Sequence, residues 1–255
     1  MLAKERQQLL IDEVNRAGRV VTSEFAAKLG VSDVTIRADL DELERRGRVT
    51  RSHGGAVTVD GTSNSAIVGF DLRMSMQREA KRRIAVAAAA YLQSNQTVIF
   101  DAGTTVHHLA STMPPVTNLT VYTPGISVAQ QLLGAEGVEM HLLGGRVDPR
   151  WLETVGTPRE QGLEDLMAHT LFLGAHGIDS DLDIVDPSQT LAQNKLQLTR
   201  HARTIVLMID STKWARSGSS KVMPLDRVDV IVTDGIVPKE LRKRVDKLDV
   251  ELLVV

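Results

Sequence analysis

The chain has 255 residues, of which 42% are hydrophobic and 24% are charged, and this composition excludes wholesale disorder. It contains no cysteine, so a disulfide framework, a thiolate nucleophile and a cysteine zinc site are excluded too. The net charge of −2 excludes a uniformly basic surface for nucleic acid. The charged residues 1–6 and the absence of a long apolar run predict a cytoplasmic chain without signal peptide or membrane span.

Residues 1–47 predict three short helices, because apolar side chains recur along them at helical spacing. The second helix follows Thr22 and the third follows Ser32, and both residue types commonly cap helix N-termini. The second helix ends before Gly30 and the third stops at Gly47, as glycine often does after a helix. The residues that carry the periodicity are Leu9, Leu10, Val14, Phe25, Ala26, Leu29, Ile36, Leu40 and Leu43.

The second and third helices are joined by a short glycine-containing turn at residues 29–32, which predicts a helix-turn-helix. In this motif the start of the second helix of the pair contacts base edges in DNA. Burial of the apolar stripe turns Arg37 outward, where it could pair with guanine O6 and N7, and Thr35 could meet a phosphate or a thymine methyl group. We therefore expect DNA contacts from Ser32, Asp33, Val34, Thr35, Arg37 and Ala38.

Two short strands, predicted at residues 48–52 and 56–59 around the turn His53-Gly54-Gly55, would form a wing beside the DNA backbone. Arginines near this wing could neutralise phosphates without reading the base sequence. The acidic residues of the third helix oppose DNA binding unless they pair with arginine or point away. The further residues expected to contact DNA are Arg45, Arg48, Arg51 and His53, and the acidic residues concerned are Asp33, Asp39, Asp41 and Glu42.

After a Gly/Ser/Thr-rich linker, placed at residues 58–75, strands alternate with helices over residues 76–255. Short Val/Ile/Leu runs of this kind predict an α/β domain with a mainly parallel, doubly wound sheet that is covered on both faces. Strands are predicted at 97–100, 119–123, 138–143, 171–174, 204–209, 229–233 and 250–254, and helices at 76–92, 126–133, 189–201 and 239–245.

Three glycine-containing loops follow predicted strands of this domain. Asp101-Ala102-Gly103-Thr104-Thr105 leads into a short helix expected from Val106, and this arrangement can bind an anion at the helix start. Ligands in open α/β sheets lie beyond the carboxyl ends of the strands, so the loops could converge on one ligand. Each loop alone is more simply interpreted as a tight turn. The other two loops are Gly144-Gly145-Arg146 and Gly174-Ala175-His176-Gly177, and positive charge could come from Lys195 and Lys213.

The remaining signals for catalysis or cofactors are weak. Neither a dinucleotide-binding G-x-G-x-x-G nor a P-loop is present, and we expect no cofactor. His107 and His108 are adjacent on a helix and face different directions, so we expect no metal site. Ser211 has no base signature nearby, so we expect no catalytic residue. Trp151 could stack on a sugar, although a partly buried loop anchor is the simpler interpretation.

The head of the chain closely resembles the DeoR-type family of bacterial transcription regulators. The resemblance rests on residues 20–32, on the string Thr35-Ile36-Arg37-Ala38-Asp39-Leu40 and on the wing His53-Gly54-Gly55-Ala56. One departure is Ala38, where the family usually has a second arginine. The later part is similar to the sensor domain of the same family, in the same order, through Asp101-x-Gly103-Thr104-Thr105, Leu142-Leu143-Gly144-Gly145, Phe172-x-Gly174-x-x-Gly177-Ile178, Lys195 and Asp210-Ser211-Thr212-Lys213.

The resemblance implies a winged helix-turn-helix domain at residues 1–57 and an effector domain at residues 76–255. The effector domain would be similar in fold to ribose-5-phosphate isomerase and would bind a phosphorylated sugar. Gly103, Thr104 and Thr105 would hold the phosphate, and Asp101 and Lys213 would complete the pocket. The effector-binding residues expected in this way are Asp101, Gly103, Thr104, Thr105, Thr123, Gly144, Gly145, Arg146, Gly174, His176, Gly177, Lys195 and Lys213.

The function that the resemblance implies is a regulator of carbohydrate metabolism genes, a repressor rather than an activator, acting on double-stranded operator DNA. One small head makes few contacts, so a homodimer or homotetramer is expected. The first alternative is a sugar-phosphate isomerase with Asp101 or Asp179 as its base, although His176 occupies a key position of the isomerase turn. The second alternative is a scaffold whose helical head contacts proteins instead of DNA.

Overall fold

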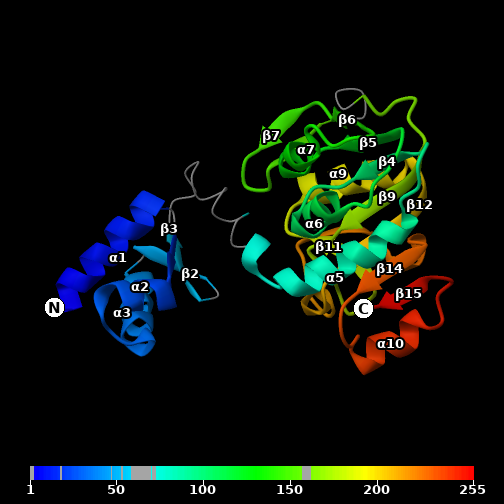
Figure 1. The fold of residues 1–255 in the computed structure, drawn as a ribbon. Helices are drawn as coiled ribbons and strands as arrows, with labels where there is room; N and C mark the ends of the chain where they lie inside the picture. The colour runs from blue at the N-terminus through cyan, green and yellow to red at the C-terminus, as the bar shows by residue number, and fades with distance from the viewer. Residues whose placement is uncertain are drawn as a thin grey trace. The chain divides into compact units, whose positions relative to one another are not determined.

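The structure is a computed structural model in which the chain divides into two units, Met1–Leu72 and Arg73–Val255 (Figure 1). The second unit begins three residues before the start predicted for the α/β domain. Most of the predicted linker, with Gly47 and His53, lies outside the described residues, which are 3–17, 19–46, 48–52, 54–58, 70, 73–156 and 162–255.

The first unit packs three helices against a small antiparallel sheet. The sheet has the strand order β1-β3-β2, so the wing strands β2 and β3 are joined by a third strand that the sequence did not predict. Leu10, Ile36 and Leu40 are fully buried in its core. The elements are α1 (Ala3–Ala17), β1 (Arg19–Val21), α2 (Thr22–Leu29), α3 (Asp33–Arg45), β2 (Val49–Ser52) and β3 (Gly55–Thr58).

The helix ends of this unit follow two of the predictions and correct one. Ser32 caps α3, because its hydroxyl accepts from the Thr35 N–H at 3.2 Å. Gly30 follows α2 with a φ of 65°, in the left-handed region that favours glycine. Thr22 is not the cap of α2: it is the first helical residue, and its buried hydroxyl has no hydrogen-bond partner among the described residues.

The second unit is built on a seven-stranded parallel sheet with the order β15-β14-β12-β9-β4-β5-β6. The strands are β4 (Thr97–Phe100), β5 (Leu119–Thr123), β6 (Val138–Leu142), β9 (Ala168–Gly174), β12 (Ala202–Ile209), β14 (Val230–Thr233) and β15 (Glu251–Val254). The helices are α5 (Arg78–Ala88), α6 (Thr104–Thr112), α7 (Ile126–Leu132), α9 (Gln189–Thr199) and α10 (Lys239–Val245).

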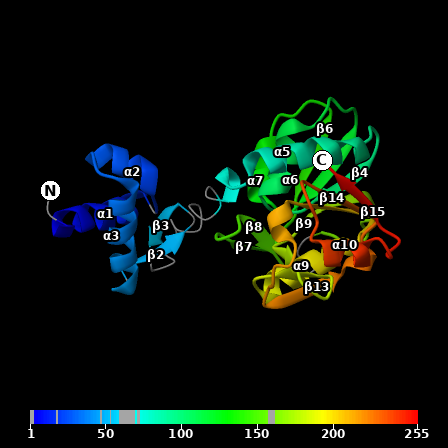
Figure 2. The ribbon, with the colours of Figure 1, turned by 90° about the horizontal axis from the view of Figure 1, so that it is seen from below.

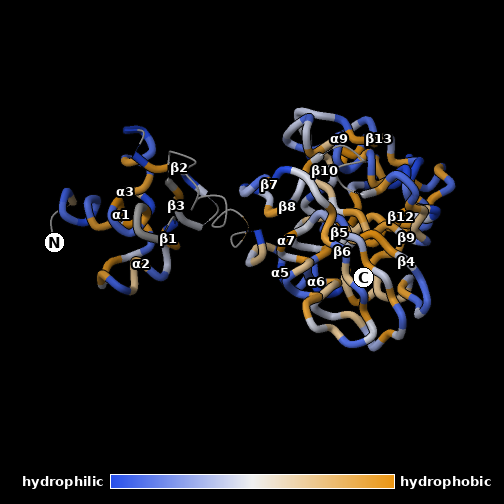
Figure 3. Tube along the Cα trace, turned by 90° about the horizontal axis from the view of Figure 1, so that it is seen from above, coloured by the Kyte–Doolittle hydropathy of each residue, from blue (hydrophilic) through white to orange (hydrophobic). Residues whose placement is uncertain are grey.

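Helices cover both faces of this sheet, as predicted (Figures 1 and 2). Helices α5, α6 and α7 pack on one face around Phe100 and Phe172, whose rings meet edge to face at 5.2 Å. Helices α9 and α10 pack on the other face with Leu171 and Leu207. Figure 3 shows apolar residues gathered along the central strands β4, β9 and β12, which are buried on both sides.

Five short strands that the sequence did not predict lie beside the main sheet. β7 (Arg146–Asp148) and β8 (Glu153–Val155) form a hairpin, and β10 (Gly177–Ile178), β11 (Asp183–Asp186) and β13 (Ser220–Pro224) form an antiparallel sheet. Both additions contribute residues to the cavity described below. No helix in the described part of the chain is long and apolar enough to span a membrane.

Candidate functional site

Strand β4 leads into the start of helix α6, and this junction forms the floor of a cavity in the second unit. Gly103 precedes the helix with a φ of 120°, which glycine tolerates because it has no Cβ. The helix begins at Thr104 and not at Val106, so Thr104 and Thr105 lie in its first turn. Backbone N–H groups of a first helical turn have no partner within the helix, and together with the helix dipole they favour an anion.

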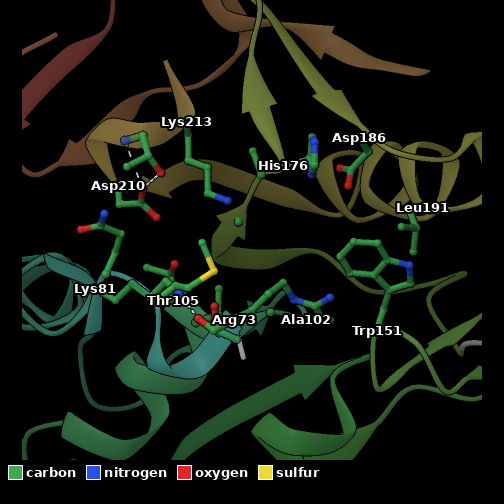
Figure 4. A pocket seen from close by; sticks show the side chains of 18 of the residues that line it. Arg73, Lys81, Ala102, Thr105, Trp151, His176, Asp186, Leu191, Asp210 and Lys213 are labelled. Carbon is green, nitrogen blue, oxygen red and sulfur yellow. Dashed lines mark hydrogen bonds between the residues drawn. The ribbon is translucent and has the colours of Figure 1, made fainter. Parts of the chain in front are cut away.

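The cavity has a volume of about 230 Å³ and is lined by segments from across the unit. Figure 4 shows Lys81 and Lys213 on one side and Asp186 and Trp151 on the other. The lining residues are Arg73, Met76, Gln77, Lys81, Ala102, Gly103, Thr104, Thr105, Val106, Trp151, Glu153, Gly174, Ala175, His176, Asp186, Leu191, Lys195, Asp210, Thr212, Lys213 and Arg216.

Positive charge in the cavity comes from residues far apart in the sequence. Arg73, Lys81, Lys213 and Arg216 all line it. Burial lowers the pKa of Arg73 to about 10 and that of Lys81 to about 8, and it lowers the pKa of Lys213 as well. Asp210 also lines the cavity, but its carboxylate accepts from the N–H and the hydroxyl of Thr212. Burial has removed part of the hydration that stabilises these cations, so they favour an anionic ligand, whose charge would stabilise them instead.

Buried carboxylic groups lie near the same cavity. Burial raises the pKa of Glu153 to about 8 and that of Asp186 to about 6, although Lys195 opposes both shifts. Glu153 ends the hairpin turn at the start of β8, and Asp186 ends β11. Glu153 is therefore mostly protonated at neutral pH, whereas Asp186 is mostly ionised.

An ion pair beneath the cavity joins Lys195 of α9 to Asp101. The Lys195 ammonium donates to Asp101 Oδ2, which also accepts from the Gly174 N–H at 3.0 Å. Burial alone would lower the pKa of Lys195, but the carboxylates of Asp101 and Asp186 raise it above its usual value. Asp101 Oδ1 and Asp186 Oδ2 are buried without a hydrogen-bond partner among the described residues, and of these two residues only Asp186 lines the cavity.

Part of the predicted effector set comes together at this cavity. Asp101 lies beneath it, and the set contributes seven lining residues. His176 is half-buried, and burial lowers its pKa to about 4, so its ring is neutral at pH 7. Trp151 lines the cavity too and is half-buried, with the Arg73 guanidinium over its ring, which fits both the loop-anchor and the sugar-stacking interpretation. The lining residues of the set are Gly103, Thr104, Thr105, Gly174, His176, Lys195 and Lys213.

The rest of the predicted set does not line the cavity. Thr123 is fully buried, and its hydroxyl accepts from the Gly125 N–H at 3.0 Å. Gly145 has a φ of 117° and supports close approach of the hairpin, since a Cβ there would lie 2.5 Å from the Val155 carbonyl oxygen. Gly177 likewise faces the Arg216 backbone, 2.5 Å from such a Cβ. Gly144 and Arg146 belong to the same hairpin as Gly145 and do not line the cavity.

Several lining residues were missed by the sequence reasoning. Arg73 and Lys81 come from the chain before and within α5, Glu153 from β8 and Asp186 from β11. None of them belongs to a local motif, because only the packing of the strands brings them together. The short antiparallel strands that carry two of them have no clear alternation of polar and apolar residues to reveal them.

The start of α3 presents the predicted DNA-reading residues on an accessible surface. Ser32, Val34, Arg37 and Ala38 are exposed, and Val34 retains 71% of its accessible area. Asp33 and Thr35 are half-buried. An exposed apolar side chain beside an exposed arginine suits a surface that meets base edges. His53, predicted to contact the DNA backbone, lies outside the described residues.

Three of the four acidic residues of α3 named above are paired, which weakens the main objection to DNA binding, whereas half-buried Asp33 has no ion pair in the described part of the chain. Asp39 accepts from Arg6 of α1 and from Gln7. Asp41 pairs with Arg51 at 2.9 Å, and Glu42 pairs with both Arg45 and Arg46. In the described part of the chain Arg48 and Arg37 have no ion pair, so these two present unneutralised charge.

The structure brings no metal cluster together in the residues that it describes. Groups of three or more His, Asp or Glu side chains placed to hold a metal ion are lacking there. The rings of His107 and His108 lie at 82° to one another, with their centroids 6.3 Å apart. His107 contacts the Ser127 carbonyl, at 3.1 Å, through its Nδ1.

Residues 6–62 match the model of the DeoR-like helix-turn-helix domain, and residues 76–235 match that of the DeoR C-terminal sensor domain. An Escherichia coli O157:H7 protein, provisionally named the aga operon transcriptional repressor, is 32% identical over 98% of this chain and 93% of its own length. The Haloferax volcanii regulator GlpR is 32% identical over 99% of this chain and 98% of its own. The glycerol-3-phosphate regulon repressor of Escherichia coli K12 is 28% identical, covering 93% of both chains.

Two solved structures are similar at lower levels. A D-ribose-5-phosphate isomerase covers 54% of this chain and 54% of its own, with 11% identity and a TM-score of 0.41. The sorbitol operon regulator SorC of Klebsiella pneumoniae covers 95% of this chain and 100% of its own, with 12% identity and a TM-score of 0.41. The named sequence relatives are transcription regulators, which favours a regulator over the isomerase and scaffold alternatives. The two domain matches confirm the resemblance, and the chain belongs to the DeoR family of DNA-binding transcription regulators.

Proposed function

We propose that this regulator binds operator DNA through α3 and its wing, and that a phosphorylated sugar in the cavity of the second unit controls that binding. It acts in the cytoplasm on genes of carbohydrate metabolism, most simply as a repressor, as the names of two relatives indicate. The observation that carries the proposal is the lining of one cavity, in which Lys81 and Lys213 lie with Asp210 on one side and Asp186 and Trp151 lie on the other.

The side with Lys81 and Lys213 suits a phosphate. Lys81 and Lys213 lie in one cavity with the first turn of α6, so ammonium groups and backbone N–H groups are available to the same anion. Charge-assisted hydrogen bonds of this kind are stronger than those between neutral groups. Lys81 is only 4% exposed, so it has lost most of its contact with water and gains most from a bound anion.

The opposite side suits the hydroxyl groups of a sugar. Asp186 lines the cavity, its Oδ2 is a buried acceptor without a partner among the described residues, and sugar hydroxyls are donors. Protonated Glu153 can donate as well as accept. Trp151 adds an apolar surface for the carbon face of a sugar ring.

DNA binding by this chain requires more than one copy. A single helix-turn-helix contacts few bases, and dimers of such heads bind two half-sites about one helical turn apart. We therefore propose a homodimer or a homotetramer. The sugar phosphate would bind two conformations of this assembly with different affinities, because only such a difference can shift the operator equilibrium.

A thermal-shift panel tests the ligand class. We expect glycerol 3-phosphate, ribose 5-phosphate, fructose 1-phosphate or glucose 6-phosphate to raise the melting temperature of the second unit, by mass action. The corresponding compounds without phosphate should have no effect at equal concentration. Lys213→Met should reduce the shift at equal ligand concentration, whereas Lys221→Met, which removes an exposed partner of Asp183, should not. Equal shifts from a sugar and its phosphate would refute the phosphate assignment.

Operator binding is tested with a duplex selected from randomised DNA by the wild-type protein. Arg37→Ala should weaken binding and relax the preference at one base position, by about 1–3 kcal/mol. Arg48→Ala should weaken binding to all duplexes and lower the salt slope by about one. Lys239→Ala in α10 is the matched loss of a cation in the other unit and should change neither. Unchanged affinity in both arginine variants would overturn the assignment of this surface.

A further inference from the structure

The first residues of the second unit form part of the cavity wall. Arg73, Met76 and Gln77 line the cavity, and the chain before Arg73 leads into the DNA-binding unit. We call residues 73–77 the strap. No other part of the cavity wall is separated from the first unit by so short a length of chain. A ligand that touches the strap therefore touches the chain where the two units are connected.

Specific contacts hold the strap against the cavity. The Arg73 guanidinium lies over the Trp151 ring, 4.2 Å from its centroid, and donates to the Arg150 carbonyl at 3.3 Å. The Lys81 ammonium donates to the Arg73 carbonyl. The strap thus lies between the β7–β8 hairpin on one side and α5 on the other.

The strap ends in an uncommon backbone conformation. Gln77 has a φ of 51°, in the left-handed region that residues other than glycine rarely adopt, and it directly precedes α5. Its carbonyl accepts from the Lys81 N–H at 2.9 Å, so the turn is tied into the first turn of that helix. A conformation of this kind persists when surrounding contacts enforce it, and here these contacts come from the cavity wall.

Both cations at the strap have a reason to bind an anion. Burial lowers the pKa of Arg73 and of Lys81, because removal from water destabilises the charged form of each side chain. A phosphate bound near them would offset that destabilisation. It would contact Arg73 directly, and it would compete with the Arg73 carbonyl for the Lys81 ammonium.

We propose that the strap is the coupling element of this regulator: Arg73 contacts the anionic group of the effector, and its rearrangement on Trp151 changes the affinity of the chain for DNA. The inference rests on the proposed function, because it assumes a phosphorylated effector in the cavity. It assigns different roles to two cations of the same cavity. Lys213 only binds the effector, since it lies in a segment between β12 and β13 of the second unit, whereas Arg73 binds it and transmits its presence.

The test compares Arg73→Met with Lys213→Met in the full-length chain. The operator dissociation constant is measured without effector and at saturating effector, with the panel compound that gives the largest thermal shift in wild type. Both variants should bind that compound more weakly, which calorimetry would quantify. At saturation, Lys213→Met should change operator affinity by the wild-type factor, whereas in Arg73→Met that factor should fall about tenfold or to unity. If saturating effector changed the operator affinity of Arg73→Met by the same factor as in wild type, the inference would be overturned.

A fluorescence measurement keeps the inference testable if no panel compound binds. The chain has two tryptophans, so Trp214→Phe leaves Trp151 as the single reporter. Inorganic phosphate should change the Trp151 emission in this variant, and adding Arg73→Met should remove the change, while adding Lys221→Met should not. If no panel compound raises the melting temperature but inorganic phosphate changes the Trp151 emission, the sugar phosphate would be rejected as the effector. Anion binding at the strap would then still stand. A phosphate response that survives Arg73→Met would reject the strap.

Discussion

Lys195 and Asp101 form a buried ion pair that ties helix α9 to the loop after β4. The side chain of Asp101 is 1% exposed and that of Lys195 is 9% exposed. The same carboxylate holds the Gly174 N–H, so one group fixes the ends of two neighbouring strands at the carboxyl edge of the sheet. The cavity floor therefore depends on this ion pair, because either charge would be costly to bury without its partner.

Removing one partner of this pair should destabilise the second unit strongly. Asp101→Asn leaves the Lys195 ammonium buried beside only Asp186 and Glu153, and breaking a buried pair in this way costs about 3–5 kcal/mol. Urea unfolding followed in the second unit would measure the loss. The control is Lys221→Ala, which breaks an exposed pair with Asp183 and should cost at most about 1 kcal/mol. A cost for Asp101→Asn as small as that of the control would contradict the role given to the pair.

Binding of a phosphorylated sugar should weaken as the pH rises through 8. The pKa of Lys81 is lowered to about 8, so its ammonium is mostly charged at pH 7 and mostly neutral at pH 9. A sugar phosphate is already dianionic over this range, since its second pKa is about 6, and the change reports the protein. Titration calorimetry at several pH values would measure it.

Glu153 loses its proton in the same range and also disfavours an anion, so the two groups must be separated. In a Glu153→Gln background the decline above pH 8 should persist, because Lys81 still titrates. Adding Lys81→Arg should move the decline to higher pH, since the guanidinium stays charged. A pH-independent affinity in Glu153→Gln would show that Lys81 does not hold the phosphate.

The main sheet was predictable because its buried strands produce a pattern that can be seen in a short stretch of sequence. Strands buried on both faces need nearly continuous apolar runs, and 97–100 and 204–209 are runs of this kind. The antiparallel strands beside the sheet lack such apolar runs: β10 contains two residues, and β13 begins with Ser220 and Lys221. Their strand geometry is imposed by partners far away in the sequence, such as the pairing of β11 with both β10 and β13.

The cavity was predictable only where a local motif contributes to it. Gly103 and Thr104 could be found because a glycine after a strand and before a helix is an anion-binding pattern. Arg73 and Asp186 could not, because their approach depends on the folded arrangement of separate segments. Gly144 and Gly145, which precede β7, do not line the cavity, and Gly145 shows the related difficulty that close backbone approach and ligand approach require the same residue type.

Releasing the arginines of α3 should strengthen nonspecific DNA binding. Glu42 accepts from Arg46 at 2.6 Å and also pairs with Arg45, so part of their charge is neutralised within the protein. Glu42→Gln should raise the affinity for unrelated duplexes and steepen the salt dependence by about 0.9 for each new phosphate contact. Fluorescence anisotropy at several salt concentrations would show both effects. The matched change Glu240→Gln, which breaks an exposed pair with Lys243 in the second unit, should leave the salt dependence as in wild type. A wild-type salt dependence in Glu42→Gln would count against phosphate contacts by Arg45 and Arg46.

A methyl group at Gly55 should disrupt the sheet of the DNA-binding unit. Gly55 pairs with Val21, and a Cβ there would lie 1.8 Å from the Val20 carbonyl oxygen, so β1 and β3 could not stay in register. Gly55→Ala should therefore cost at least the roughly 1–3 kcal/mol that is typical of overpacking, which is a large fraction of the stability of a small unit.

Adjacent Gly54 provides the matched control for this substitution. Its φ is 83°, and a Cβ there meets nothing within 4 Å, so Gly54→Ala carries only a backbone cost of about 1 kcal/mol. Calorimetry of the full chain should show a lower melting temperature for the first unit in Gly55→Ala than in Gly54→Ala, with the second unit unaffected in both. Operator affinity should fall in the same order, because the wing depends on the β1–β3 pairing. Equal melting of the two variants would mean that β1 is not needed to hold the wing.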